Sequence, residues 1–163
     1  MKILLIRHAA AVPRGTQGTD DTTRPLTPRG AKRFRRAAQG LIRVVDRPDA
    51  LLTSPWRRAR ETADIAAVAF QGPAPVETEA LTGAPFEDLL SALAELGDIN
   101  LVALIGHEPW MSELLARLTG ATMPERFEFR KGGVALVDCP SGVRDGGRLL
   151  FYLPPRVLRR LGT

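Results

Sequence analysis

The 163-residue sequence contains one cysteine and two histidines, and aromatic residues make up only 6% of the chain. The single cysteine, Cys139, excludes an internal disulfide. We expect no conventional zinc site, because such sites usually take three or four His, Cys or carboxylate ligands. The low aromatic content leaves few rings for the base stacking that nucleic-acid binding uses, and no nucleic-acid-binding motif is present.

Long apolar stretches are also missing from the sequence. No run approaches the ~18 residues of a membrane span. The apolar run Ile3–Ile6 is too short for the hydrophobic region of a secretory signal and leads directly into Arg7 and His8. We therefore expect a soluble, cytoplasmic protein with no membrane partner. The length, together with 44% hydrophobic and 25% charged residues, predicts a single domain over residues 1–163.

The net charge of +5 is unevenly distributed along the chain. Residues 1–60 contain 14 Lys and Arg against 4 Asp and Glu, whereas residues 61–163 contain 9 against 14. A basic half is typical of proteins that bind an anionic partner such as phosphate, nucleic acid or an acidic protein face. The alternative is an arginine-rich surface that is only solvated, and composition does not decide between the two.

Apolar runs and turn residues predict six extended segments. Strands are expected at residues 2–6, 50–53, around 76, at 101–105, 134–137 and 149–153. The segments between them have helical periodicity. Helices are expected from Pro28 (with Thr27 as N-cap) to about Val45, from Ser54 to about Phe70, from Pro85 to Leu96, from Pro109 to Leu118, and in the basic C-terminal tail.

This order of elements predicts an α/β fold. Strand–helix alternation followed by a strand pair indicates three α/β/α layers, with a mostly parallel sheet, helices on both faces and an antiparallel edge at the end. In the first helix the apolar residues recur at helical spacing and are expected to face the core; they are Ala31, Phe34, Ala38, Leu41, Ile42 and Val45.

Polar side chains follow three of the predicted strands. Arg7-His8 ends the first strand, Thr53-Ser54 the second, and Gly106-His107 the strand at 101–105. Ligands bind at the carboxyl ends of strands in open α/β sheets, so both histidines are expected at one edge. Arg58 follows closely in the second helix. A pocket that combines two imidazoles, several guanidinium groups and helix N-termini is suited to bind a dianionic phosphoryl group.

Four segments, in order, resemble motifs of the histidine phosphatase superfamily (branch 1). Arg7-His8-Ala9 is similar to its Arg-His-Gly motif, and residues 24–30 (RPLTPRG) to its Pro-Leu-Thr-x-x-Gly helix opening. Residues 54–62 (SPWRRARET) resemble Ser-Pro-x-x-Arg-Ala-x-x-Thr, and residues 106–109 (GHEP) the second histidine motif. The short chain and residues 131–135 (KGGVA) resemble the SixA-type phosphohistidine phosphatases.

The resemblance implies a phosphoglycerate-mutase-like fold and assigns roles to single residues. His8 would be the nucleophile, and Arg7, Arg58 and His107 would hold the phosphoryl oxygens. Arg24 would bind substrate, and no metal or cofactor is required. Ala9 stands where the wider superfamily often has glycine, so we expect ordinary backbone geometry after His8.

The proton donor is the least determined part of the site. Glu79 is the nearest positional match to the carboxylate of larger members; the other candidates are Glu77, Glu87, Asp88 and Glu108. A phosphohistidine substrate depends less on this acid, because imidazole is a better leaving group than an alkoxide.

The resemblance predicts a phosphatase that forms a phosphohistidine intermediate and acts on a phosphohistidine-bearing protein. The alternatives are a phosphomonoesterase acting on a small phosphate ester and a phospho-binding module without turnover. Nucleic-acid binding through the basic first helix is a further alternative, and we expect no such partner.

Overall fold

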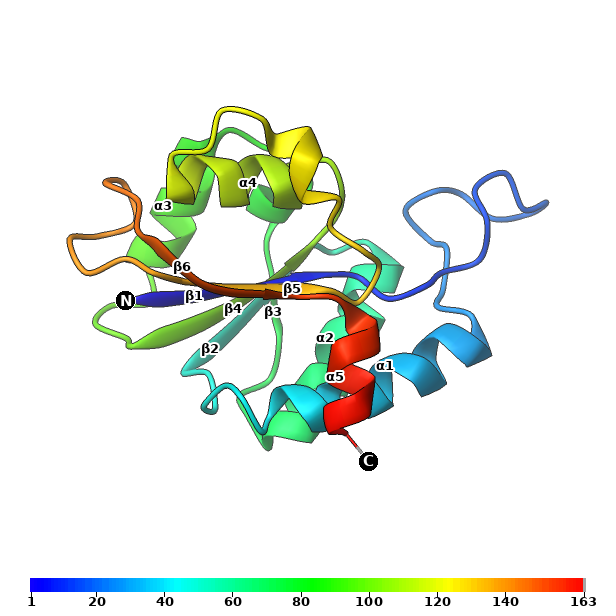
Figure 1. The fold of residues 1–163 in the computed structure, drawn as a ribbon. Coiled ribbons are helices and arrows are strands. Elements are labelled where there is room, and N and C mark those ends of the chain that lie inside the picture. The colour runs from blue at the N-terminus through cyan, green and yellow to red at the C-terminus, as the bar shows by residue number, and fades with distance from the viewer. Residues whose placement is uncertain (163) are drawn as a thin grey trace.

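The computed structural model describes residues 1–162, and within them six strands form one mixed sheet (Figure 1). The order across the sheet is β3-β2-β4-β1-β5-β6. The first four of these are parallel, and β5 and β6 add an antiparallel edge. The strands are β1 (Lys2–Arg7), β2 (Ala50–Thr53), β3 (Val76–Glu77), β4 (Leu101–Gly106), β5 (Val134–Asp138) and β6 (Arg148–Leu153).

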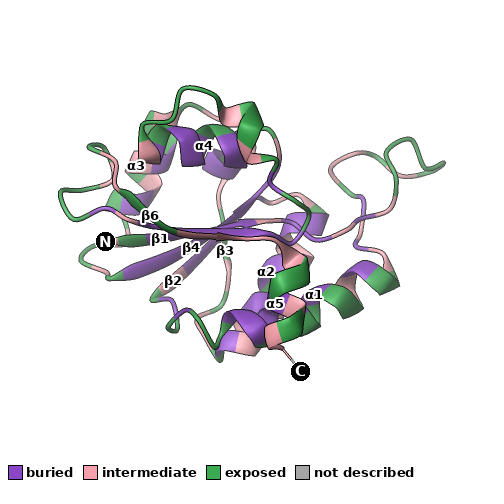
Figure 2. Cartoon of the chain, viewed as in Figure 1, coloured by how far each residue is buried: buried purple, intermediate pink, exposed green. Residues whose placement is uncertain are grey.

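Helices cover both faces of the sheet, which confirms the predicted α/β/α layers. One face is covered by α1 (Pro28–Leu41), α2 (Arg57–Phe70) and α5 (Pro155–Leu161), and the other by α3 (Phe86–Ala94) and α4 (Trp110–Thr119) (Figure 1). Each layer encloses its own apolar cluster, and the helix sides that face the sheet are buried (Figure 2). Two short 3₁₀ helices, Glu79–Leu81 and Pro124–Phe127, were not expected from the sequence.

The predicted start of α1 is confirmed, but its end is not. The Thr27 side chain accepts a hydrogen bond from the Gly30 N–H at 2.9 Å, and Pro28 occupies the first turn. The helix ends at Leu41 instead of near Val45 and continues as turns. Ile42 is 38% exposed, so the expectation that it faces the core is wrong. After Leu41 the backbone bonds become those of turns, with the Arg43 N–H donating to the Gly40 carbonyl and the Val44 N–H to the Leu41 carbonyl, so the 3.6-residue period on which the expectation rests ends there.

The start of α2 also differs from the prediction. The helix begins at Arg57 because Ser54 and Pro55 form a turn, in which the Ser54 hydroxyl accepts a hydrogen bond from the Trp56 N–H at 3.2 Å. This turn leaves the Ser54 side chain at the edge of the sheet.

Three strands end side by side at one edge of the sheet. Arg7 of β1 is in register with Gly106 of β4, and Thr53 of β2 with Ile105. The His8 N–H donates to the Gly106 carbonyl, and the Ser54 N–H to the Ile105 carbonyl, each at 3.0 Å. The residues that follow these strands, His8, Ser54 and His107, are therefore brought together by the parallel pairing.

Cys139 follows β5 and is fully buried in the cluster on the α3–α4 face. Burial raises the pKa of its thiol. None of the helices formed by residues 1–162 is long and apolar enough to cross a membrane.

Candidate active site

A cavity of about 530 Å³ opens where β1, β2 and β4 end. Five of the six residues predicted for the site line it: Arg7, His8, Arg24, Arg58 and His107. The other lining residues come from the loop after β1, the turn before α2, the segment after the Glu79–Leu81 turn, the start of α4 and the loop before β5; they are Pro13, Arg14, Trp56, Thr82, Gly83, Glu108, Pro109, Trp110, Glu113 and Lys131.

His8 is held as a neutral imidazole with a defined tautomer. Its Nδ1 lies 2.7 Å from the Ala9 carbonyl oxygen, which can only accept, so we place the ring proton on Nδ1. The Arg58 Nε–H donates to Nε2 at 3.2 Å. Burial, helped by His107 and Arg58, lowers the pKa of His8 to about 2. The Nε2 lone pair is therefore available at neutral pH.

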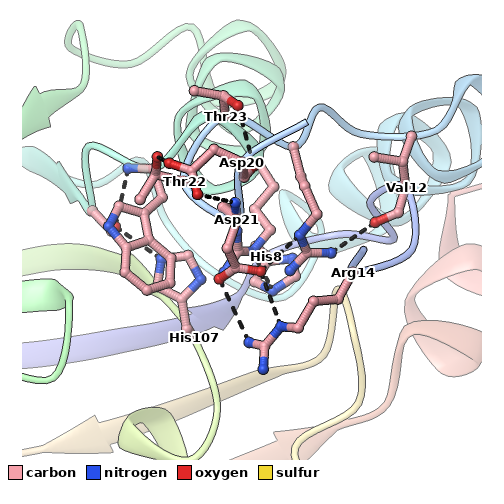
Figure 3. Close-up of polar contacts among 12 residues, drawn as sticks. His8, Val12, Arg14, Asp20, Asp21, Thr22, Thr23 and His107 are labelled. Carbon is pink, nitrogen blue, oxygen red and sulfur yellow. Dashed lines mark hydrogen bonds and ion pairs between the residues drawn. The ribbon is translucent and has the colours of Figure 1, made fainter. Parts of the chain in front are cut away.

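His107 lies next to His8, with 5.1 Å between the ring centroids (Figure 3). Its Nε2 is 2.8 Å from the Ser54 hydroxyl oxygen, and its ring also contacts Trp56 at 4.6 Å between centroids. Nδ1 is buried and has no hydrogen-bond partner within residues 1–162. Burial, together with the charge of Arg58, lowers the pKa of His107 to about 3.

Arg58 is 2% exposed and has four partners. Besides His8, its guanidinium contacts the Asp21 carbonyl at 2.5 Å and the Asp21 carboxylate at 3.5 Å. It also lies over the Trp56 ring, 4.7 Å from the centroid. These contacts fix the plane of the guanidinium group beside the His8 ring.

Asp21 connects three arginines of the cavity, a role that the sequence did not reveal. Its carboxylate accepts from Arg24 Nε at 2.9 Å and from Arg14 Nε at 3.0 Å, in addition to Arg58 (Figure 3). Desolvation opposes the charged form, but the three guanidinium groups hold the pKa of Asp21 below its ordinary value. Arg24 also donates to the Val12 carbonyl at 2.7 Å. A single aspartate in a polar loop does not allow these contacts to be predicted from the sequence.

Arg7 approaches the cavity from the end of β1. Its Nη1 donates to the Phe129 carbonyl, and its Nε is buried without a partner in the described chain. Burial lowers its pKa from the ordinary arginine value, but an arginine side chain stays charged at any working pH.

The motif threonine Thr62 and the preceding Glu61 of α2 hold the loops around His8. The Thr62 hydroxyl accepts from the Ala9 N–H at 3.0 Å and donates to the Arg58 carbonyl at 2.6 Å, so one side chain connects the backbones of both site segments. The Glu61 carboxylate accepts from the Leu26 N–H at 2.7 Å and ties the loop with Arg24 to α2.

Of two motif glycines, Gly30 is explained by close backbone approach and Gly132 by its positive φ of 77°. A Cβ on Gly30 would overlap the Ala10 carbonyl oxygen in the segment after His8. The Gly132 N–H is shared by the carbonyls of Arg7 and His8, at 3.0 and 3.1 Å. Ala9 does not have positive φ, as expected for alanine.

The structure does not bring Glu79 into the cavity. Glu79 begins the 3₁₀ turn Glu79–Leu81, is exposed, and its Oε2 lies 3.4 Å from the Thr82 hydroxyl. The carboxylates that line the cavity are Glu108 and Glu113. The Glu108 Oε2 accepts from the Ser112 hydroxyl at 2.7 Å, and its Oε1 is buried without a partner among residues 1–162. Burial raises the pKa of Glu108.

Comparisons with known proteins agree with this geometry. The family model of the histidine phosphatase superfamily (branch 1) matches residues 3–83. An uncharacterized protein of Picosynechococcus sp. is 34% identical over 152 residues, which cover 90% of this chain and 86% of the relative.

Two solved structures share the fold along almost the whole chain. A protein provisionally named phosphohistidine phosphatase SixA from Agrobacterium tumefaciens has a TM-score of 0.76 and 28% identity, with 94% of this chain and 97% of that chain covered. The protein histidine phosphatase SixA complexed with tungstate has a TM-score of 0.80 and 25% identity, with 97% and 99% covered. These similarities confirm the phosphoglycerate-mutase-like fold implied by the sequence motifs. The nearly complete coverage of both chains also shows that this chain and the two SixA proteins are similar in length. The chain therefore belongs to the histidine phosphatase superfamily (branch 1), whose members are phosphatases that form a phosphohistidine intermediate.

Proposed function

We propose that this protein hydrolyses phosphohistidine on a protein substrate and that His8 carries the phosphoryl group between the two half-reactions. The observation that supports this most is the state of His8: a buried, neutral imidazole whose Nε2 lies in a cavity lined by four arginines.

The nucleophile is His8 Nε2. This nitrogen attacks phosphorus in line, the bond from phosphorus to the leaving nitrogen breaks, and phosphohistidine forms on the enzyme. Water then attacks the same phosphorus and releases inorganic phosphate and free His8. The Ala9 carbonyl stabilises the Nδ1–H, which becomes more acidic as the ring gains positive charge.

Arg7 and Arg58 balance the charge of the transferring group, the neutral His107 offers it a hydrogen bond, and Arg24 binds the substrate. The guanidinium fork matches two phosphoryl oxygens at once. Asp21 orients Arg24 and Arg58 before substrate arrives, which lowers the cost of reorganisation during the reaction. Tungstate in the SixA structure is a tetrahedral oxyanion similar in shape to phosphate.

Glu108 is the carboxyl group that we assign as proton donor, in place of Glu79. It lines the cavity directly after His107, and its buried, unpartnered Oε1 favours the protonated form. An acid of this kind is needed most when the leaving group is an alkoxide. For phosphohistidine the leaving imidazole requires less assistance.

The function is tested by measuring kcat/KM on a phosphohistidine-bearing protein, an aryl phosphate, and a panel of sugar and nucleotide phosphates. We expect the phosphohistidine protein to be the best substrate and His8→Asn to abolish turnover of every substrate. Acid quenching during turnover should trap an acid-labile phosphoenzyme in the unsubstituted protein and none in His8→Asn.

Three results would contradict the proposal. Turnover that persists in His8→Asn would exclude the proposed nucleophile. A sugar or nucleotide phosphate that outperforms the phosphohistidine protein would identify a small-molecule phosphomonoesterase. Binding of phosphorylated protein without any phosphoenzyme or released phosphate would identify a phospho-binding module.

A further inference from the structure

A second cavity of about 730 Å³ lies next to the active-site cavity, and the mechanism does not use it. It is formed between α1, the loop before β5 and the start of α5, which pack together at this side of the molecule (Figure 1). Lys131 lines both cavities, and Ala9, which follows His8, lines the second one. The second cavity is therefore bounded by the residue that directly follows the proposed nucleophile in the sequence.

The wall of the second cavity is basic throughout. Five cationic side chains line it and no acidic side chain does; the five are Arg33, Arg130, Lys131, Arg156 and Arg159. Arg130 is paired with Glu128, but both groups are exposed and contribute little screening. No carboxylate in residues 1–162 pairs with Arg33, Arg156 or Arg159.

These cations repel one another, which is unfavourable for the free protein. Burial, together with the charges of Arg33, Arg36 and Arg156, lowers the pKa of Arg159. A concave surface lined by one sign of charge concentrates the potential and attracts the opposite charge. The sequence also allowed these arginines to form a surface that is only solvated. In that case they would lie apart on a convex helix face.

The floor of this cavity is apolar. Phe34 and Ala37 of α1, with Pro154 and Pro155 at the start of α5, line it below the cations. A single phosphate group needs only two or three donors. Five cations on three chain segments over an apolar floor instead suit an extended chain that carries several carboxylates and also buries side-chain carbon.

We propose that this second cavity binds an acidic segment of the protein substrate that flanks the phosphorylated histidine. Carboxylates of that segment pair with Arg33, Arg156 and Arg159, and Lys131 lies between the bound segment and the phosphoryl group. The inference rests on the proposed function, because it names the kind of protein that reaches His8.

The first experiment compares two phosphohistidine peptides that differ only in their flanks, Glu and Asp in one and Gln and Asn in the other. We expect a KM about tenfold lower for the acidic peptide, equivalent to two partly exposed ion pairs. In Arg33→Gln/Arg159→Gln this preference should disappear, with kcat and the hydrolysis of an aryl phosphate unchanged. Arg35→Gln, which removes an exposed arginine of α1 outside the second cavity, should keep the preference.

The second experiment does not depend on turnover. Titration of the unphosphorylated acidic peptide should show binding to the unsubstituted protein, weakened by salt, and at least fivefold weaker binding to Arg33→Gln/Arg159→Gln. This distinguishes failure of the second cavity from failure of the proposed function. The proposal is overturned if both peptides behave alike, if Arg35→Gln has the same effect as the double variant, or if a small bisphosphate or an oligonucleotide shows the Arg33 and Arg159 dependence in place of the acidic peptide.

Discussion

The two ring nitrogens of His8 have different partners, and this difference decides the chemistry of the residue. The Ala9 carbonyl fixes the proton on Nδ1, so the nitrogen that faces Arg58 carries the lone pair, which accepts a hydrogen bond from the Arg58 Nε–H. A residue with the same sequence context but a proton on Nε2 could not act as a nucleophile there. The tautomer is set from both sides, by the Ala9 backbone carbonyl at Nδ1 and by the Arg58 donor at Nε2.

Glu108→Gln is expected to affect substrates according to their leaving groups. Hydrolysis of an alkyl phosphate should fall by about 100-fold, the lower range for general acid catalysis, because the alkoxide then leaves unprotonated. Hydrolysis of phosphohistidine or an aryl phosphate should fall by less than about tenfold, since these groups leave readily. Steady-state kcat values on the three substrates check this.

Glu79→Gln is the matched control, because Glu79 is exposed and lies outside the cavity. It should leave all three rates unchanged. A selective loss on the alkyl phosphate in Glu79→Gln, with Glu108→Gln active, would return the role of proton donor to Glu79.

At the scale of elements, the start of α1 and the start of α2 hold the segment after β1 from two sides. Gly30 of α1 lets the helix approach the Ala10 carbonyl, and Thr62 of α2 binds the Ala9 N–H. The loop before β5 adds a third contact through the Gly132 N–H. The backbone around His8 is thus fixed by elements distant in sequence, which explains why the motif residues include a glycine and a threonine without a direct chemical role.

Gly30→Ala is expected to destabilise the fold and to impair the site. The new methyl would overlap the Ala10 carbonyl oxygen, which belongs to backbone and cannot move as a flexible side chain does. Overpacking of this kind typically costs about 1–3 kcal/mol, and displacement of Ala10 would also move His8. Urea unfolding and kcat together measure the two effects.

The control is Gly72→Ala, whose Cβ would lie at ordinary contact distances of 3.4 Å from Phe70 and 3.5 Å from Leu51. It should change the free energy of unfolding by less than about 1 kcal/mol and leave kcat unchanged. Equal effects of the two substitutions would show that the contact between α1 and the Ala10 segment is not tight in solution.

At the scale of the whole molecule, the fold brings cations from both halves of the chain to two neighbouring cavities. Arg7, Arg24 and Arg58 line the first cavity, and Arg33 lines the second, together with cations from the C-terminal part. Because both histidines are buried among these cations, the stability of the folded state depends on pH.

The free energy of unfolding is expected to fall as the pH decreases below about 6.5. His8 and His107 have pKa values of about 2 and about 3 in the folded protein, against about 6.5 when unfolded. The unfolded state therefore binds more protons in this range, and each histidine costs on the order of 2 kcal/mol of stability between about pH 7.5 and about pH 5. Urea unfolding at these two pH values measures the loss.

His8→Asn/His107→Asn should remove most of this pH dependence. Asp21, with its lowered pKa, contributes a separate loss only at lower pH, where carboxylates protonate. A free energy of unfolding that stays constant from about pH 7.5 to about pH 5 in the unsubstituted protein would show that the histidines are solvated.

The sequence alone was sufficient for the order of elements and for most of the site. Periodicity and turn residues predicted the strands and helices, because alternation and capping are local properties of the chain. The positions of His8 and His107 at strand ends predicted their meeting, because parallel pairing brings the carboxyl ends of strands to one edge. The arginines followed from the motifs that surround them.

Only the tertiary structure decided the rest, since it depends on contacts between distant segments. The helix α1 gives way to turns after Leu41, Asp21 joins three guanidinium groups, and the carboxyl groups that line the cavity are Glu108 and Glu113, because the 3₁₀ turn places Glu79 outside it. The second basic cavity likewise exists only where α1, α5 and the loop before β5 pack together. Local patterns determine which residues form an element, whereas the directions and partners of polar side chains follow from packing.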